Sequence, residues 1–282
     1  MDNVMRGTIT VRDLDVLQVE KRTNRTGTLA RFPAHVHNDY QIVYAPAIVN
    51  QYTYRGARHV APPASLTILH PNEVHDAVGL ADLSRDVPLY VFHLCPQFVK
   101  GFHREEDAFS EVDGSLLFET IVSGRHMVQQ LERLAEATFA PGASHLNCQE
   151  RLVRFIVDLT ARYSSSPGSA RDLSPDHRLV NTIREYLYAH ANENISIDTL
   201  CRISGTSRTR LCGTFRRTTG ISLHAFQIQV RVERARTLLV RSGASLSETA
   251  RDTGFADQSH FARHFKRLVG VSPGCYQVEK GA

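Results

Sequence analysis

The sequence predicts a two-domain protein of the α+β class, with a β-rich N-terminal domain and an all-α C-terminal domain. Three observations lead to this expectation. Short apolar stretches separated by turn residues fill the region from Leu29 to about Leu94. Helical patterns replace them further on, and the last third of the chain contains one helical unit twice. At 282 residues the chain is long enough to form two hydrophobic cores.

The N-terminal domain is expected to occupy residues 1–163. Its strand candidates follow one another at a spacing of about 8–12 residues with no helix between them, which is typical of a sandwich or barrel. Residues 1–27 are polar with scattered β-branched side chains and fit an arm or an edge strand. The strand candidates are Gln41–Ala45, Ala47–Tyr54, Arg58–Val60, Ser65–Leu69 and Leu89–Leu94.

Two helical stretches, Leu116–Phe139 and Leu146–Tyr163, should flank the β-rich part, within residues 116–163. Apolar residues recur at helical spacing in the second stretch. This stripe fits either the core of the domain or a dimer interface. A linker rich in serine follows at 164–175, and the next helix should begin near Pro175, at a position where proline is favoured.

The C-terminal domain, residues 176–282, repeats one unit. Gly205 has its counterpart in Gly254, 49 residues later, and Ser207 has its counterpart in Asp257, 50 residues later. Each unit contains a short helix, a glycine turn, a capping residue and a second helix that ends in basic residues. This is the signature of a helix-turn-helix. The units span about 196–218 and 245–269.

Side-chain spacing separates the two faces of each second helix. Leu211 and Phe215 are four residues apart and share one face, as do Phe261 and Phe265, so these pairs are expected in the core. The opposite faces carry polar and basic residues. Between the units, Leu223–Val240 reads as one helix of about 27 Å, long enough to hold two recognition helices roughly one turn of DNA apart.

The charge distribution agrees with this interpretation. Residues 176–282 contain 16 basic and 9 acidic residues, whereas residues 1–175 contain 17 and 20. A basic C-terminal third favours a polyanionic partner. No apolar run approaches the length of a membrane helix, and the five cysteines form no CxxC pair. We therefore expect reduced thiols and a cytoplasmic protein without a membrane partner.

The C-terminal domain resembles the AraC/XylS family of transcription regulators along its whole length. The resemblance is carried by Ile197-x-x-Leu200-Cys201, by Gly205-x-Ser207-x-x-x-Leu211-x-x-x-Phe215-Arg216-Arg217-x-x-Gly220, by Arg231-x-x-x-Ala235-x-x-Leu238-Leu239, by Ala250-x-x-x-Gly254-Phe255, and by His260-Phe261-x-x-x-Phe265-Lys266-Arg267-x-x-Gly270-Val271-Ser272-Pro273. It implies double-stranded DNA as a partner, a small-molecule effector, contact with RNA polymerase, a homodimer, and activation more often than repression.

The resemblance places the base-facing positions on Thr209, Cys212 and Gly213 in the first unit. In the second unit it places them on Gln258, Ser259, His260 and Arg263. Cysteine and glycine offer little for base recognition, so we expect the second unit to provide more specificity and the first to bind mainly phosphates. The full set of candidate DNA contacts is Arg208, Thr209, Arg210, Cys212, Gly213, Arg216, Arg217, Gln258, Ser259, His260, Arg263, Lys266 and Arg267.

Half of the 14 histidines lie between His35 and His103. His35 and His37 would point to the same face of a strand, toward the interior of the domain. With His75 one hairpin later, this resembles the cupin pattern, which implies a β-barrel of the jelly-roll type. Gln41 stands where that pattern has an acid.

Glutamine is a poorer metal ligand than glutamate, so a metal site of His35, His37 and His75 is only a weak alternative. The other interpretations are hydrogen-bonded lining residues or binders of an organic effector. The resemblance to AraC/XylS regulators places such an effector inside the barrel. The candidate effector-binding residues are His35, His37, Tyr40, Gln41 and His75.

The sequence as a whole therefore predicts a DNA-binding transcription regulator controlled by a small molecule, with no catalytic residues and no other cofactor. Two alternatives remain at this point. One is a ligand-independent regulator whose barrel only dimerises. The other is a cupin metalloenzyme, which the glutamine at position 41 argues against.

Overall fold

The N-terminal domain is built from two large β-sheets and a two-stranded sheet, β10-β12. The computed structural model describes residues 7–24, 31–80, 86–102, 117–165 and 175–278. A seven-stranded sheet has the order β11-β7-β4-β9-β2-β1-β13, and a four-stranded sheet has the order β3-β8-β5-β6. The second sheet and the N-terminal strands of the first are antiparallel, so the expected jelly roll appears as two sheets; the described strands do not form a closed barrel.

The strands are β1 (Gly7–Asp13), β2 (Leu17–Asn24), β3 (Arg31–His35), β4 (Tyr40–Tyr44), β5 (Asn50–Tyr54), β6 (Ala57–Ala61), β7 (Leu66–Leu69), β8 (His75–Gly79), β9 (Val87–Leu94), β10 (Leu117–Phe118), β11 (Ile121–Val122), β12 (Ser164–Ser165) and β13 (Tyr276–Val278). The polar segment expected to be an arm or edge strand forms both β1 and β2. Residues 1–6 and 25–27 of that segment lie outside the described residues.

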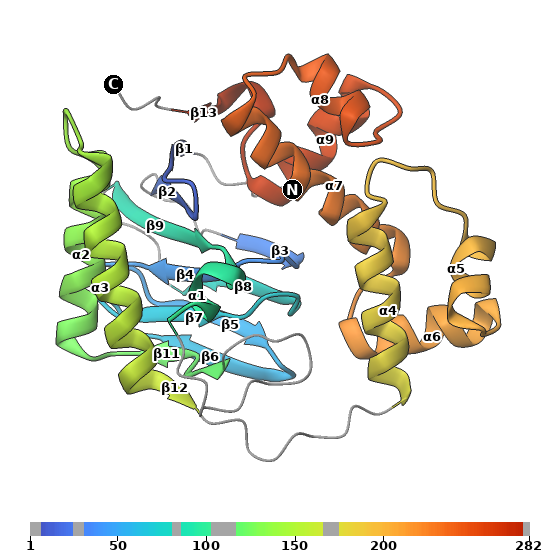
Figure 1. The fold of residues 1–282 in the computed structure, drawn as a ribbon, viewed down its shortest axis with the longest axis horizontal. Coiled ribbons are helices and arrows are strands. Elements are labelled where there is room, and N and C mark those ends of the chain that lie inside the picture. The colour runs from blue at the N-terminus through green and yellow to red at the C-terminus, as the bar shows by residue number, and fades with distance from the viewer. Residues whose placement is uncertain (1–6, 25–30, 81–85, 103–116, 166–174, 279–282) are drawn as a thin grey trace.

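Two long helices cover the outer face of the seven-stranded sheet (Figure 1). These are α2 (Arg125–Phe139) and α3 (His145–Tyr163); a short helix, α1 (Pro96–Lys100), follows β9. Leu131, Leu134 and Phe155 are among the helix residues that pack into one core with the sheet. The stripe expected on the second helix is therefore core, because its members Leu152, Phe155, Ile156 and Leu159 are all buried there.

The helix expected from residue 116 begins later, at Arg125. Its first part, where described, forms β10 and β11 instead. The Phe118 ring is buried beside Tyr40, and its backbone N–H donates to Nε2 of His70 at 2.8 Å. These contacts with residues distant in the sequence override the local helical pattern.

The C-terminal domain contains only helices and two short terminal elements among its described residues. Its elements are α4 (Pro175–Ala189), α5 (Ile197–Ser204), α6 (Arg208–Thr219), α7 (Leu223–Arg241), α8 (Leu246–Asp252), α9 (Gln258–Val269) and a 3-10 turn at Pro273–Cys275. As predicted, Ser207 and Asp257 cap α6 and α9 by accepting from backbone N–H groups. No helix in the described part of the chain has the length and apolar character needed to cross a membrane.

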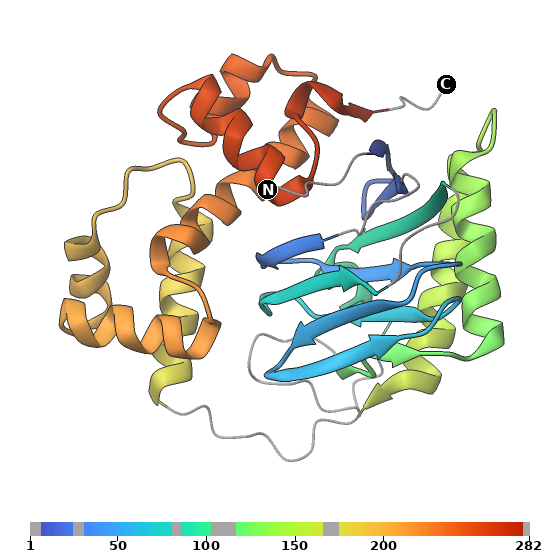
Figure 2. The same cartoon turned by 180° about the vertical axis from the view of Figure 1, so that it is seen from behind.

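Helix α7 joins the two units as one continuous helix (Figures 1 and 2). Arg231 lies buried in its middle and donates to the carbonyls of Ala191 and Glu193, at 2.9 and 2.8 Å, just after α4. Gly254, in the turn before α9, has φ +81° and lies so close to Asn192 that a Cβ would approach its carbonyl oxygen to 2.7 Å. These contacts fix one helix-turn-helix unit against the other.

The second unit is attached to the N-terminal domain by a strand. After the expected terminal turn, β13 pairs in parallel with β1, so the end of the DNA-binding domain extends the N-terminal sheet. Ile9 and Val11 of β1 are buried in the same core as Phe261 and Phe265 of α9. The two domains therefore share one hydrophobic core at this point.

A buried ion cluster accompanies this contact. The Glu20 carboxylate is fully buried, binds Arg22 at 2.7 Å and Arg236 of α7, and accepts from the Tyr276 hydroxyl at 2.7 Å. Burial alone would raise the pKa of Glu20, but the two guanidinium groups outweigh it and hold the pKa well below its usual range. Removing one partner of such a cluster costs about 3–5 kcal/mol, so it fixes α7 on the sheet.

A second set of polar contacts links α7 to the segment after β3. Gln229 donates to the carbonyl of Ala34 at 3.0 Å, and the Asn38 backbone N–H donates to Glu233 Oε1 at 3.0 Å. Glu233 Oε2 is buried without a partner. Burial and the neighbouring Asp39 raise the pKa of Glu233 to about 8. At pH values between the unfolded pKa of Glu233 and about 8, the Glu233 carboxyl is protonated in the folded protein and ionised in the unfolded chain.

We predict that Glu233→Gln stabilises the protein increasingly as pH rises. Because the pKa of Glu233 is higher in the folded than in the unfolded state, the free energy of unfolding of the parent protein falls between about pH 5 and pH 8. A neutral glutamine does not contribute this pH dependence. Thermal midpoints at constant ionic strength should show a difference that grows over this range and levels off above it.

The matched control is Glu185→Gln, an exposed glutamate of α4, which should show no such growth. A difference between Glu233→Gln and the parent that stays constant from pH 5 to pH 8 would contradict the assignment.

Candidate functional site

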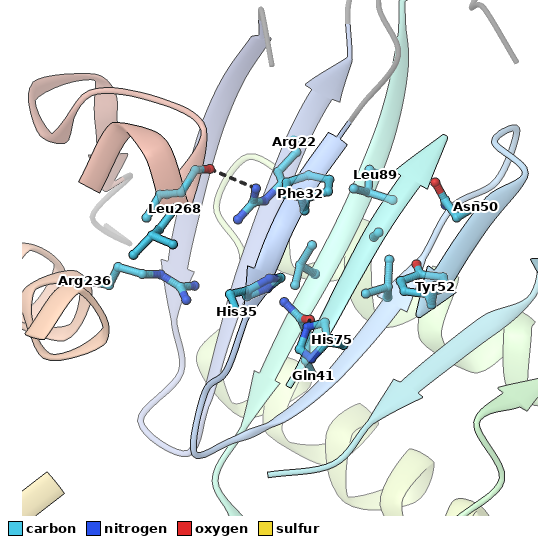
Figure 3. Close-up of a pocket in the computed structure, with 14 residues that line it drawn as sticks. Arg22, Phe32, His35, Gln41, Asn50, Tyr52, His75, Leu89, Arg236 and Leu268 are labelled. Atoms are coloured by element: carbon cyan, nitrogen blue, oxygen red, sulfur yellow. Dashed lines mark hydrogen bonds between the residues drawn. The ribbon is translucent and has the colours of Figure 1, made fainter. Parts of the chain in front are cut away.

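A cavity lies between the two sheets and is closed on one side by the DNA-binding domain (Figure 3). Both sheets and two helices of the C-terminal domain contribute its wall. From the DNA-binding domain come Arg236 of α7 and Leu268 and Val269 of α9. From the N-terminal domain come Arg22, Phe32, His35, Gln41, Val43, Asn50, Tyr52, His75, Ala77, Leu89 and Val91.

The lining combines an apolar wall with an excess of positive charge. Arg22 and Arg236 are its charged residues, and no carboxylate belongs to the described lining. Arg22 also donates to the Val269 carbonyl at 3.1 Å and so connects this side of the cavity with α9 (Figure 3). The cavity measures about 60 Å³, well below the roughly 150 Å³ of a cavity that holds benzene. A larger ligand therefore requires the wall to move.

Two of the predicted histidines, His35 and His75, line this cavity, and His37 lies beside them in an adjoining hollow that also contains Glu233 and Arg236. His35 stands opposite His75 across the β3–β8 pairing, next to an irregularity that shifts the register. Their ring centroids are 4.2 Å apart, and those of His37 and His75 are 4.9 Å apart. Gln41 Oε1 lies 3.2 Å from Nε2 of both His37 and His75. The sequence-based grouping of these four residues is thus reproduced in space.

The imidazoles of this cluster are uncharged at neutral pH. Burial lowers the pKa of His35 to about 4, and burial lowers the pKa of His37 and of His75 well below the usual value. Neighbouring positive charge acts in the same direction. A neutral imidazole can accept a hydrogen bond or donate a lone pair to a metal.

Tyr40, the fifth candidate, lies elsewhere. Its side chain is buried in the core between the seven-stranded sheet and α2 and α3, because adjacent residues of a strand point to opposite faces. It does not line the cavity. His70 is also separate: it stacks on Tyr54, accepts from the Phe118 backbone, and has a pKa lowered to about 3 by burial.

Several lining residues escaped the sequence analysis. Arg22, Asn50, Tyr52, Arg236, Leu268 and Val269 all belong to the cavity wall. One signal was present for Arg22: Glu20 and Arg22 are two residues apart in a predicted strand segment, which places two opposite charges on one face. For the residues of α7 and α9 there was no such signal, since their position depends on how the domains dock.

The DNA-facing candidates of the first unit are all exposed. They lie on one outer surface of α6, while Leu211 and Phe215 are fully buried beneath. Arg208 forms an ion pair with Asp198 at 3.6 Å and Arg217 with Asp176 at 3.2 Å. Such surface pairs are weak and can exchange for phosphate contacts. Nothing lies within 4 Å of the position a Cβ would take at Gly213.

In the second unit, the candidates on α9 differ in exposure. Gln258, Ser259, Arg263, Lys266 and Arg267 are exposed. His260, by contrast, is half-buried, with its ring against Phe255 and its Nε2 at 3.0 Å from that of His264. This ring is therefore held at the margin of the surface, although the family resemblance counts it among the base-facing positions.

Two family models match the chain and together cover most of it. An AraC-like ligand binding domain matches residues 22–154, and a helix-turn-helix domain matches residues 200–278. The first match contains all the cavity residues of β2 to β9, and the second contains α6, α7 and α9.

Two relatives match this chain over most of its length and most of their own. An uncharacterized HTH-type transcriptional regulator, YbfI of Bacillus subtilis (strain 168), is 24% identical over 83% of this chain and 82% of its own. The HTH-type transcriptional activator RhaS of Enterobacter sp. (strain 638) is 23% identical over 86% and 87%.

The fold is also that of a solved protein. A crystal structure of ToxT from Vibrio cholerae O395 superposes with a TM-score of 0.61 at 15% identity, covering 92% of this chain and 95% of ToxT. With its ligand-binding and helix-turn-helix domains matched in this order, the chain belongs to the AraC family of transcriptional regulators.

Proposed function

We propose that this regulator responds to an anionic small molecule, and that the molecule acts by changing how the second helix-turn-helix unit is docked. The observation that carries this proposal is the shared wall of the cavity. Arg236, Leu268 and Val269 belong to the DNA-binding domain, yet they close the same space as His35 and Tyr52. A ligand there contacts both domains directly.

The small size of the cavity supports the link between binding and docking. An effector larger than a few atoms must displace part of the wall. The strands of both sheets are held by ladder hydrogen bonds, whereas α9 itself contacts the cavity through side-chain packing and the Arg22–Val269 hydrogen bond, with the β1–β13 pairing beyond its C-terminal end. Effector binding would therefore shift the population of docked and displaced second units.

The charge of the lining indicates the effector class. Arg22 and Arg236 share the Glu20 carboxylate, so the lining of the cavity has an excess of positive charge. An anionic group satisfies it, and the apolar wall of Phe32, Val43, Leu89 and Val91 suits a hydrocarbon portion. Solved ToxT structures contain an unsaturated fatty acid and an (E)-4-(8-methylnaphthalen-1-yl)but-3-enoic acid, which are carboxylic acids of this kind.

On DNA, the exposed faces of α6 and α9 would enter two successive major grooves. In our proposal α9 provides most of the base recognition through Gln258 and Arg263, and α6 binds phosphates through its arginines. Activation through contact with RNA polymerase and a cytoplasmic location also belong to this proposal.

We propose further that the protein is a homodimer through α3. Leu146, Val153 and Val157 are 75%, 38% and 46% exposed, and their spacing of seven and four residues places them on one helix face. This spacing is that of a coiled-coil seam, which a second copy of α3 can match by two-fold symmetry.

Arg263→Ala and Gly213→Ala should have different effects on DNA recognition. Loss of Arg263 removes a contact worth about 1–3 kcal/mol of base discrimination, a factor of about 5–150 at one operator position. In Gly213→Ala the added methyl group would have no atom within 4 Å, so the substitution should stabilise helix α6 by about 1 kcal/mol without changing base preference. Binding to a panel of operator point variants at fixed salt measures both.

In the same panel, Arg216→Ala should weaken binding to all operators by a similar factor. It should also reduce the slope of log binding constant against log salt concentration by about one. Equal loss of base discrimination at the two half-sites for Arg263→Ala and Gly213→Ala would contradict the unequal roles.

A thermal-shift screen of carboxylic acids, each beside its uncharged primary amide, tests the effector class. At a concentration of about 100 times its Kd, a true effector adds about 2.7 kcal/mol to the free energy of unfolding, which raises the thermal midpoint by roughly 5–10 °C. We expect the acid and not the amide to do so, with the shift much reduced in Arg22→Gln.

Arg241→Gln is the control, because this arginine also links the domains, through Asp13, but lies outside the cavity. A screen in which no acid shifts the midpoint or changes operator binding would instead favour a ligand-independent regulator.

The double variant Val153→Glu/Val157→Glu should be monomeric. Placing like charges on a two-fold seam costs several kcal/mol of association energy. Sedimentation or light scattering measures the mass, and Val60→Glu, an equally exposed valine on β6, should remain dimeric. An unchanged mass for the double variant would place the interface elsewhere.

A further inference from the structure

The geometry points to a binding site for a first-row divalent transition metal ion, held by Nε2 of His35, His37 and His75 with Gln41 Oε1 as an oxygen ligand. These three histidines offer ring nitrogens that all lie within 4.8 Å of one another. The site goes beyond the anionic effector proposed above, because it names a cation at the inner end of the cavity and does not need that effector.

The protonation of the rings can be deduced from their partners. Nδ1 of His35, His37 and His75 lies 2.8, 2.8 and 3.0 Å from the backbone carbonyls of Pro33, Asp39 and Glu73. A carbonyl oxygen only accepts, so each Nδ1 carries the proton and donates it. In a neutral ring the other nitrogen, Nε2, then has a free lone pair. Nδ1–H bonded to a carbonyl with Nε2 left for the ion is the arrangement of metal-ligating histidines.

The lone pairs converge on one place. Gln41 Oε1 is an acceptor, yet it lies 3.2 Å from two nitrogens, those of His37 and His75, that also have lone pairs. Three electron-rich atoms in contact are stabilised by a cation between them. The opposite orientation of the amide would let Gln41 donate to both rings, and the experiment below distinguishes these two arrangements.

The distances require a modest contraction. In a tetrahedral site with metal–nitrogen bonds of about 2.1 Å, ligand atoms are about 3.4 Å apart. One ring nitrogen of each histidine lies within 4.8 Å of the other two, so rotation of the rings is needed to bring all three Nε2 atoms around one ion. Imidazole ligands favour Zn²⁺, Co²⁺, Ni²⁺ or Fe²⁺ over Mg²⁺ and Ca²⁺, which prefer oxygen. A single ion fits within a cavity of about 60 Å³.

The site adjoins the contact with α7. His37 lies next to Asn38, whose N–H binds Glu233, and His35 lies next to Ala34, whose carbonyl accepts from Gln229. An ion that draws His35 and His37 together acts on the segment that holds α7. Provided that docking of this helix controls DNA binding, as proposed above, metal occupancy would alter operator affinity.

Titration of the full-length protein with Co²⁺ after chelator treatment tests the site. The ligand-field absorption of Co²⁺ in the visible range reports nitrogen ligation and geometry, and calorimetry with Zn²⁺ gives the affinity. We expect one ion per chain, with at least a 30-fold weaker affinity in His75→Ala and in His37→Ala. Gln41→Glu should bind about tenfold more tightly and change the Co²⁺ spectrum.

His126→Ala, which removes an exposed histidine of α2, should bind like the parent protein. Circular dichroism and thermal midpoints establish whether each variant is folded. If a histidine variant does not fold, the gain of affinity expected in Gln41→Glu still tests the site.

Absence of stoichiometric binding in the parent protein, or binding that His75→Ala and Gln41→Glu leave unchanged, would overturn the site and indicate an amide that donates to the rings. Neither result affects the anionic effector when the acid–amide screen is run on protein that has been treated with chelator.

Discussion

The buried carboxylate of Glu20 is the interaction on which the arrangement of the two domains depends. A buried charge is costly unless it is paired, and the partners come from three segments: Arg22 from β2, Arg236 from α7 and Tyr276 from β13. Two of these belong to the DNA-binding domain. Because separating α7 from the sheet would leave the carboxylate with fewer partners, the ion cluster holds the domains in one defined orientation and thereby forms the cavity between them.

In the proposed function, this orientation connects the cavity with DNA binding. Its wall contains the C-terminal turn of α9, and the N-terminal turn of the same helix carries Gln258 and Ser259, which are proposed to contact DNA. A ligand and an operator would therefore act on opposite ends of one rigid helix. Coupling of this kind needs no chain of intermediate residues, because a single element contacts both sites. The histidine cluster lies at the other end of the cavity, against the segment that contacts α7.

The helix-turn-helix domain was predicted well, and its signals explain why. Capping by Ser207 and Asp257 and burial of Leu211 and Phe261 follow from spacing within a few residues. The N-terminal strands were located approximately for the same reason. The helix expected from residue 116 was wrong in its first part, because β10 and β11 form by pairing with distant strands. Local periodicity does not report such pairing.

By itself, the sequence determined the class of protein, the duplicated DNA-binding unit, and the His35, His37, Gln41 and His75 grouping. The duplicated unit and the pairing of His35 with His37 follow from patterns within a few residues, whereas the class of protein and the addition of Gln41 and His75 rest on the resemblance to known families. Only the tertiary structure decided that Tyr40 faces away, that β13 joins β1, and that Arg22 and Arg236 face one cavity. Arg236 and Glu20 are 216 residues apart. A contact over such a distance arises from the docking of two cores, and no local pattern encodes it.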